Sequence, residues 1–202
     1  MLAGTGSDVG KSILAAAFCR ILKQDGYHPA PFKAQNMALN SYATPEGLEI
    51  GRAQAVQAEA AGVPCHTDMN PLLLKPSSEH TSQVVLLGKP IGDRNVYEYF
   101  RKEGREELRK VVNESYDRLA TRYNPIVMEG AGSISEINLR DVDLVNMPMA
   151  KHAGADVFLV ADIDRGGVFA SVYGSILLQT PEERSLIKGI IINKFRGDIR
   201  LF

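Results

Sequence analysis

The sequence has no tryptophan, only two cysteines and almost no net charge. Cys19 and Cys65 cannot supply a disulfide framework or a metal cluster with ligand-like spacing. With 23 Lys and Arg against 24 Asp and Glu, the net charge is −1, which gives no bulk attraction to nucleic acid or to an anionic membrane. No apolar run approaches the roughly 18 residues of a membrane-spanning helix, and the glycine-rich polar start argues against a signal peptide. These absences predict a cytoplasmic protein without nucleic-acid or membrane partners.

The pattern of the 202 residues is typical of one α/β domain with a sizeable core. Helical periodicity predicts helices over residues 11–25, 50–61 and 96–123, the last with its charges on a solvated face and the first with Cys19 in the core. Short continuous apolar runs predict strands near residues 1–3, 30–33, 72–74, 83–87, 125–128, 157–161 and 189–192. Alternating strands and helices indicate a mostly parallel sheet flanked by helices.

Both ends of the predicted fold are incomplete. The first strand has only three residues before a glycine loop, and the chain stops soon after its last predicted strand. Because an α/β unit normally continues into a further helix and strand, we expect a single domain over residues 1–202 that is truncated at both ends.

A glycine-rich loop joins the first strand to the first helix. Such a loop can surround phosphates with its amide groups, a lysine can reach the β- and γ-phosphates, and a serine hydroxyl can bind Mg²⁺. The strict P-loop pattern fails because Thr5 stands where its first glycine belongs, and the Rossmann pattern fails because of Val9. The predicted ATP-binding residues of this variant loop are Thr5, Gly6, Ser7, Asp8, Val9, Gly10, Lys11 and Ser12.

The loop is similar to that of the dethiobiotin synthetase-like P-loop ATPases. Seven further stretches, in order, resemble the cobyric acid synthase family: residues 32–41, 49–54, 69–76, 129–133, 136–143, 161–169 and 192–198. The resemblance covers nearly the whole chain, and it implies a P-loop NTPase fold of the dethiobiotin synthetase type. The family also has a C-terminal glutamine amidotransferase domain, which we expect to be absent from this chain.

The resemblance implies a ligase of cobalamin biosynthesis. ATP would activate peripheral carboxylates of adenosylcobyrinic acid a,c-diamide as acyl phosphates, and ammonia from glutamine would convert them to the amides of adenosylcobyric acid. ATP and Mg²⁺ are the implied cofactors. The implied partners are a corrinoid substrate and a glutaminase domain normally on the same chain, and a homodimer is left open.

Catalytic and metal-binding candidates follow from the resemblance and from strand-end positions. Lys11 and Lys33 are expected at the phosphates, and Asp143 near the reacting carboxylate, where capping is the competing interpretation. Glu129 ends a predicted buried strand, where open α/β sheets bind ligands. The candidate Mg²⁺ ligands are Ser12, Glu129 and, as a less certain second acid, Glu49, with Asp8 as its alternative.

The remaining candidates would bind the two substrates. Asn193 and Lys194 end a predicted strand and match the adenine-binding Asn-Lys element of related proteins. Neutral polar groups suit a corrin whose arms alternate amides and acids, so Gln35, Asn36, Asn40 and Ser41 are predicted to bind the substrate. Asp162 follows a buried strand and is a further candidate, since a strand-end acid suits metal or substrate contact. Five methionines are expected to pack in the core: Met37, Met69, Met128, Met147 and Met149.

Three alternatives to this interpretation stay open. Cobyrinic acid a,c-diamide synthase and dethiobiotin synthetase are related ligases, although the stretches 33–41 and 162–168 argue against both. A MinD/ParA-like nucleotide-switch ATPase would carry a signature lysine early in the loop, where this chain has Gly6. A module that binds ATP without turning it over is the third.

Overall fold

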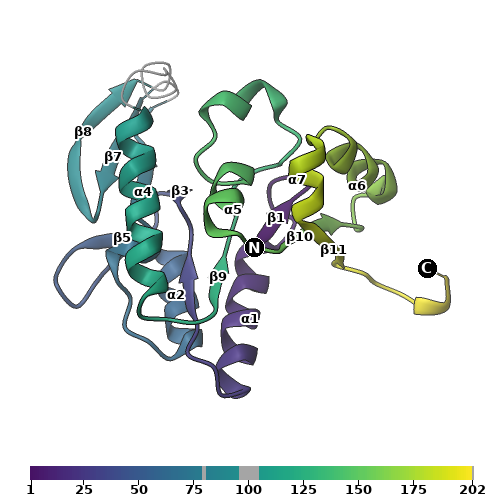
Figure 1. Ribbon diagram of the computed structural model, residues 1–202, viewed down its shortest axis with the longest axis horizontal. Coiled ribbons are helices and arrows are strands. Elements are labelled where there is room, and N and C mark those ends of the chain that lie inside the picture. Colours follow the sequence, from purple (N-terminus) through teal and green to yellow (C-terminus); the bar gives the residue numbers. More distant parts are fainter. Residues whose placement is uncertain (79–80, 96–104, 202) are drawn as a thin grey trace.

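A parallel sheet forms the centre of the molecule (Figure 1). The structure, a computed structural model, describes residues 1–78, 81–95 and 105–201. The strands are β1 (Leu2–Gly4), β2 (Ala30–Phe32), β9 (Ile126–Met128), β10 (Val157–Asp162) and β11 (Ile187–Asn193). Parallel pairs join β1 to β10, β10 to β11 and β2 to β9, and a parallel bridge between Leu2 and Glu129 links the two groups. The spatial order β2-β9-β1-β10-β11 confirms the predicted α/β class and the mostly parallel sheet.

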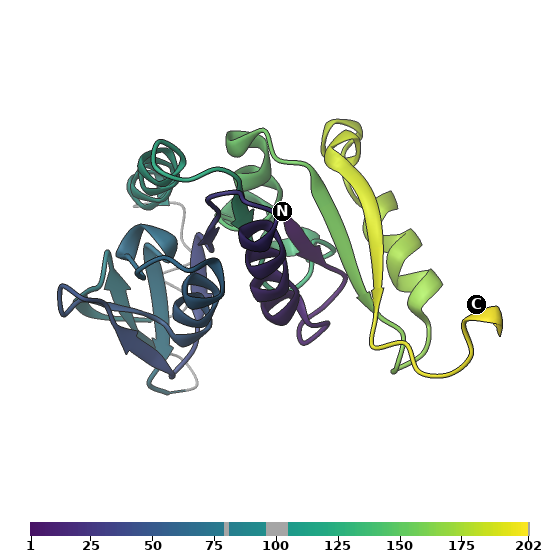
Figure 2. The same ribbon diagram turned by 90° about the horizontal axis from the view of Figure 1, so that it is seen from below.

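Helices cover both faces of this sheet (Figure 2). Along β10, Val160 packs in the cluster that includes α1 (Lys11–Gln24) and α2 (Arg52–Ala61). The neighbouring Leu159 packs in a second cluster with α5 (Met147–Ala153) and α6 (Val168–Leu177). Successive strand residues point to opposite faces, so β10 is buried on both sides over these positions, as its continuous apolar run predicts.

The first helix agrees closely with its prediction. It ends at Gln24, and Gly26 follows with a φ of 88°, a conformation that glycine adopts without strain. Cys19 is fully buried on this helix, and burial raises the pKa of its thiol to about 12. Cys19 is therefore a core residue, as the sequence predicts.

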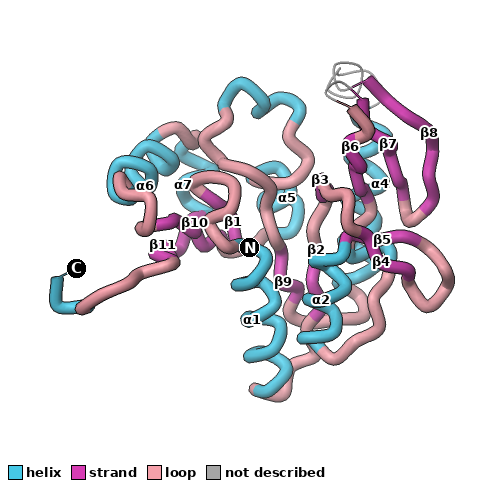
Figure 3. The backbone as a smooth tube through the Cα atoms, turned by 180° about the vertical axis from the view of Figure 1, so that it is seen from behind, coloured by secondary structure: helices cyan, strands magenta, loops and turns pink. Residues whose placement is uncertain are grey.

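A second, mixed sheet lies at one end of the molecule, seen from behind in Figure 3. Its strands are β3 (Gln35–Met37), β6 (Leu72–Pro76), β7 (Thr81–Leu86) and β8 (Lys89–Asn95), and only the β3–β6 pair is parallel. Its first strand follows β2 after two residues, and the Lys33 amide donates to the Met69 carbonyl at 2.9 Å. One stretch of chain therefore links both sheets.

Two boundaries near this sheet differ from the sequence prediction. The predicted helix over 50–61 begins only at Arg52, because β4 (Ser41–Ala43) pairs antiparallel with β5 (Glu49–Gly51) and takes Ile50 into a strand. The antiparallel pairs of the mixed sheet are not predicted from the sequence. No strand is predicted over residues 89–95, yet they form β8.

The long predicted helix corresponds to α4 (Arg105–Ala120), and its part over 96–104 lies outside the described residues. Its charges are not all on a solvated face. Arg118 donates to Asp68 Oδ1 at 2.7 Å, and Arg122 donates to Asp68 Oδ2 at 3.0 Å. Asp68 is buried in η1 (Thr67–Met69), so these ion pairs attach the helix to the chain before β6.

Shorter elements complete the chain: η2 (Ile137–Val142), α7 (Pro181–Leu186) and η3 (Ile199–Leu201). Thr180 and Glu183 form a reciprocal capping box at the start of α7, which fixes where that helix begins. Over the described residues, every helix is too short or too polar to cross a membrane.

Candidate nucleotide-binding site

The phosphate loop lies at the carboxyl end of β1, the edge at which open α/β sheets bind ligands. It is held from several directions: the Thr5 amide donates to Val160 O at 3.0 Å, and Ser133 Oγ donates to Thr5 O at 2.9 Å. Gly10 takes a φ of 99° immediately before α1, a left-handed conformation suited to glycine. The loop, the strand and the helix follow in the order that the sequence predicts.

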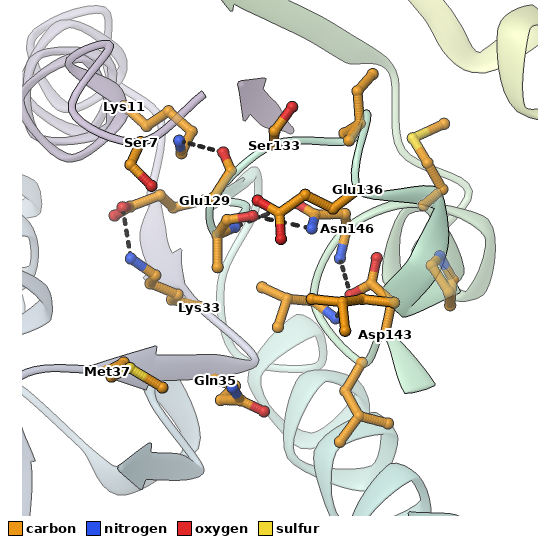
Figure 4. A pocket seen from close by; sticks show the side chains of 18 of the residues that line it. Ser7, Lys11, Lys33, Gln35, Met37, Glu129, Ser133, Glu136, Asp143 and Asn146 are labelled. Atoms are coloured by element: carbon orange, nitrogen blue, oxygen red, sulfur yellow. Dashed lines mark hydrogen bonds and ion pairs between the residues drawn. The ribbon is translucent and has the colours of Figure 1, made fainter. Parts of the chain in front are cut away.

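Lys11 is buried and turned back over the loop (Figure 4). Its Nζ donates to Gly6 O and Gly132 O, both at 2.8 Å. Burial, followed by the nearby Lys33 ammonium, lowers the pKa of Lys11 from 10.5 to about 8, and Glu129 partly opposes this. The lysine is therefore partly neutral near pH 8, and a bound anion would favour its charged form.

The carboxylate of Glu129 is the centre of the site. It is 2% exposed, and its Oε1 accepts from Ser12 Oγ at 2.7 Å and from Lys33 Nζ at 2.8 Å. The strand-end positions of Lys33 after β2 and Glu129 after β9 are adjacent because these two strands pair in parallel. The structure thus brings together four of the predicted residues, Lys11, Ser12, Lys33 and Glu129.

A cavity of about 720 Å³ opens beside this group. Its far wall is the segment after β9, which Asn146 folds back: Asn146 Oδ1 accepts from the Ala131 amide at 3.1 Å, and its Nδ2 donates to Ala131 O at 3.0 Å. Of the predicted loop residues, Thr5, Gly6 and Val9 do not line the cavity; those that do are Ser7, Asp8, Gly10, Lys11 and Ser12.

Asp143 lies on the far wall of the cavity. Its Oδ1 accepts from the amides of Val145 at 2.7 Å and Asn146 at 3.1 Å. These bonds shape the turn before α5 and are not a helix cap, because Asn146 is the N-cap residue of that helix and no side chain of the described residues caps it. The Asp143 side chain faces the cavity, as Figure 4 shows.

The predicted substrate residues divide into two groups. Gln35 and Asn36 on β3 line the cavity, and so does Met37, which is 53% exposed. The expectation that Met37 packs in the core is wrong, whereas the other four methionines of that prediction are buried. Asn40 and Ser41 lie further along the chain and do not line the cavity.

Glu49 is not brought to the site. It forms an ion pair with Lys75 Nζ on β6 at 2.5 Å. Desolvation raises the pKa of the Glu49 carboxyl, but the hydrogen bonds from Lys75 and Ser41 together lower it below its usual value. Its predicted metal role therefore has no support in this geometry. Asp8, the alternative acid, does line the cavity.

Asn193 and Lys194, at the end of β11, contact the phosphate loop. Asn193 Nδ2 donates to Val9 O at 2.8 Å, and Lys194 Nζ donates to Asp8 O and to Asp162 Oδ2, both at 2.7 Å. Lys194 lowers the pKa of the Asp162 carboxyl through this hydrogen bond. Asp162 is therefore on the β11 side of the loop, and it does not line the cavity.

The oxygen atoms at this site suit Mg²⁺, which keeps several water ligands, better than a metal ion that is bound by protein side chains alone. In residues 1–78, 81–95 and 105–201 no three His, Cys, Asp or Glu side chains gather as a metal site. Mg²⁺, however, is usually bound by one or two protein oxygens together with waters and phosphates. The hydroxyl of Ser12 and the carboxylate of Glu129, 2.7 Å apart beside the phosphate loop, provide such oxygens.

Sequence reasoning missed three buried amides of the site. Gln54 and Gln57, on α2, both donate to Glu129 Oε2, and Asn146 holds the far wall. Gln54 belongs to a stretch that supports the family resemblance, and its spacing of three from Gln57 places both on one helix face. That spacing was an available signal, although it did not indicate which acid the face would meet.

Comparisons with known proteins identify the family of this chain. A family model described as the CobQ/CobB/MinD/ParA nucleotide binding domain matches residues 1–202. The chain is 87% identical over 202 residues to a cobyric acid synthase of Bacteroides fragilis. It is 66% identical over 203 residues to one of Parabacteroides distasonis and 55% identical over 201 residues to one of Geobacillus kaustophilus. The predicted resemblance to cobyric acid synthases is thereby confirmed.

Each of these three matches covers 100% of this chain. The covered share of the relatives is 41% for the first two and 40% for the third. The chain therefore spans about two fifths of the length of the curated relatives it matches.

Proposed function

Since the chain belongs to the CobQ/CobB/MinD/ParA nucleotide-binding domain family, we propose that it is the ATP-dependent activating part of a cobyric acid synthase. The reaction proposed is amidation of peripheral carboxylates of adenosylcobyrinic acid a,c-diamide through acyl phosphates. The nitrogen would come from a glutaminase domain, as the sequence resemblance implies. The relatives are named cobyric acid synthases, which supports a ligase.

One observation carries the proposal: two buried lysines, a hydroxyl and a carboxylate meet beside the phosphate loop. Lys33 Nζ lies 2.8 Å from Glu129 Oε1, which also accepts from Ser12 Oγ. Lys11 is held above the loop. Phosphoryl transfer needs charge neutralisation and alignment more than covalent help, and this arrangement supplies both.

In the first step a substrate carboxylate oxygen attacks the γ-phosphorus, and the bond from that phosphorus to the β,γ-bridging oxygen breaks to release ADP. Lys11 and the loop amides offset the charge of the transferred group, and Lys33 draws the attacking carboxylate toward it. A bound Mg²⁺, held by Ser12 and Glu129, would neutralise phosphate oxygens. Each of these residues lies at the edge of the cavity or in its wall.

In the second step ammonia attacks the acyl carbon, phosphate leaves, and the nitrogen loses its extra proton. Asp143 is our candidate to orient the ammonia or accept that proton, because it lines the cavity with one carboxylate oxygen fixed by backbone amides. Asn193 and Lys194 remain candidates for the adenine end, since they contact the phosphate loop.

The cavity also suits a large substrate with amide arms and an apolar body. Gln35 and Asn36 offer neutral hydrogen-bonding groups on one wall, and Met37 and Ile13 expose apolar surface beside them. These features favour a corrinoid over the small substrate of dethiobiotin synthetase.

The test is an incubation of the chain with ATP, Mg²⁺, ammonium and adenosylcobyrinic acid a,c-diamide, followed by mass spectrometry of the corrinoid. We expect amidated product in this mixture and no amidated product when ATP is left out. Lys11→Ala should abolish the product, whereas Lys110→Ala, on the exposed face of α4, should not.

Two results would overturn the proposal. The first is an unchanged corrinoid in the presence of ATP, Mg²⁺ and ammonium. The second is faster ATP turnover with 7,8-diaminononanoate and CO₂, which would identify a dethiobiotin-forming ligase instead.

A further inference from the structure

Two glutamines of α2 are buried against the acid at the centre of the site. Gln54 is 0% exposed and Gln57 is 1% exposed, although glutamine is normally a surface residue. Both side chains reach Glu129 Oε2, from 3.4 Å for Gln54 Nε2 and from 2.7 Å for Gln57 Nε2. Burying an amide costs stability unless it makes hydrogen bonds. The burial of both amides against the same carboxylate therefore requires an explanation.

Gln57 is oriented by its acceptors. Its Nε2 also donates to Ser12 O at 3.2 Å, so one amide nitrogen joins the acid to the first turn of α1. Its Oε1 is buried and has no hydrogen-bond partner among the described residues. If the amide were rotated by 180°, Oε1 would face the two acceptors Glu129 Oε2 and Ser12 O, and no hydrogen bond could form there. The side chain accordingly acts as a donor only.

Gln54 is oriented from the other side, because its Oε1 accepts from Asn36 Nδ2 at 3.1 Å. That contact depends on Gly51, where an added Cβ would lie 2.6 Å from both Asn36 Nδ2 and Gln54 Oε1. A chain of hydrogen bonds therefore runs from Asn36, on the cavity wall, through Gln54 to Glu129.

These contacts divide the carboxylate into two halves. Oε2 accepts from the two amides, while Oε1 accepts from Ser12 and Lys33. Four donors around one buried carboxylate fix its rotation and hold one oxygen toward the phosphate loop. Without the amides the carboxylate could turn and offer Ser12 a different edge.

We propose that Gln57 and Gln54 are positioning residues that hold Glu129 with Oε1 beside Ser12 Oγ, in the orientation that binds a divalent cation on a nucleotide. The proposal rests on the proposed function only in requiring that the site binds ATP with Mg²⁺. Hydrogen-bond partners of metal ligands commonly change metal affinity by about 10- to 100-fold when they are removed. The shorter Gln57 contact predicts that its loss has the larger effect.

The experiment measures ATP binding to the chain by calorimetry, first in EDTA and then during a Mg²⁺ titration. Gln57→Met and Gln54→Met keep an unbranched side chain of similar length and remove the donors. Ser115→Ala is the matched control, because this buried hydroxyl on α4 donates to Val111 O and does not line the cavity. Thermal unfolding of each variant reports whether it is folded at the temperature of the titration.

For Gln57→Met we expect the Mg²⁺ concentration at half-saturation to rise by about 10-fold or more, with ATP affinity in EDTA changed less than about twofold. For Gln54→Met we expect a smaller rise in the Mg²⁺ concentration at half-saturation. This variant replaces Gln57→Met in the test if Gln57→Met does not fold. Gly51→Ala should also raise the Mg²⁺ requirement, because it displaces Gln54 without removing a donor.

An unchanged Mg²⁺ requirement in a folded Gln57→Met protein overturns the inference while leaving the proposed function intact. The inference is also overturned if Gln57→Met loses ATP affinity in EDTA by the same factor as its Mg²⁺ requirement rises, because that would indicate a general structural role. If the unsubstituted chain binds no ATP at all, the proposed function itself fails, and the inference fails with it.

Discussion

The lowered pKa of Lys11 predicts that ATP binding takes up a proton near pH 8. Burial and the neighbouring Lys33 bring this pKa to about 8, so the lysine is partly neutral at that pH. Contact with a triphosphate would favour the ammonium form and raise the pKa again. Binding and protonation are therefore linked, and raising the pH should weaken ATP binding.

The size of the effect follows from the pKa. With a free-state pKa of about 8, about half of the molecules at pH 8 and about nine tenths at pH 9 must gain a proton when ATP binds. If only the charged form binds ATP, the affinity falls by about fivefold between pH 8 and pH 9. Binding at pH 7 should be close to its maximum with respect to this group.

Calorimetry measures this uptake directly. ATP is titrated into the chain in EDTA at pH 8 and pH 9, in buffers with different enthalpies of ionisation, and the dependence of the observed enthalpy on the buffer gives the number of protons. Lys11→Met serves as the control, because it should bind ATP weakly and without the pH dependence.

Two variants test the cause of the shift. Lys33→Met removes a charge that lowers the pKa of Lys11, so its uptake curve should move to higher pH. Glu129→Gln removes a charge that raises the pKa of Lys11, so its curve should move to lower pH. A wild-type affinity that does not change between pH 8 and pH 9, or shifts of the reverse sign, would refute the reasoning.

Three further predictions concern stability and reactivity. Asn146→Ala removes both hydrogen bonds to the Ala131 backbone and should lower the free energy of unfolding by about 1–3 kcal/mol, measured in urea; an unchanged midpoint would contradict this. Asp68→Asn removes the charged partner of Arg118 on α4 and should lower the free energy of unfolding by a similar amount, about 1–3 kcal/mol; a urea midpoint equal to that of the unsubstituted chain would contradict this. Cys19, whose pKa burial raises to about 12, should react with maleimide only after unfolding, and mass spectrometry of labelled native protein would show whether it reacts sooner.

The sequence predicts those site residues whose positions follow from the neighbouring strand and helix in the chain or from the end of a strand. The phosphate loop lies between a strand and a helix that are contiguous with it, so Lys11 and Ser12 could be placed from their neighbours alone. Lys33 and Glu129 each follow a buried strand, and parallel pairing of those strands brings them to 2.8 Å. Here the general rule on strand ends was sufficient.

The parts that sequence did not predict depend on contacts between distant segments. Gln57 meets an acid 72 positions away, and nothing in an Ala- and Gln-rich helix indicates which strand it will cover. Glu49 is predicted as a metal ligand, but in the structure it forms an ion pair with Lys75, a residue of β6 that is distant in the sequence. The hairpin of β7 and β8 is also not predicted. Leu87 adopts a φ of 47° before Gly88 at its turn, and leucine is not typical of that conformation.

The contacts of β11 with the phosphate loop bear on how fast a nucleotide could bind. Asn193 and Lys194 donate to the carbonyls of Val9 and Asp8, and both bonds are internal to the chain. The entropy lost in ordering the loop therefore belongs to folding and not to ligand capture. We expect association with ATP to be governed by encounter rather than by slow loop closure, so that differences in affinity among loop variants appear mainly in the dissociation rate.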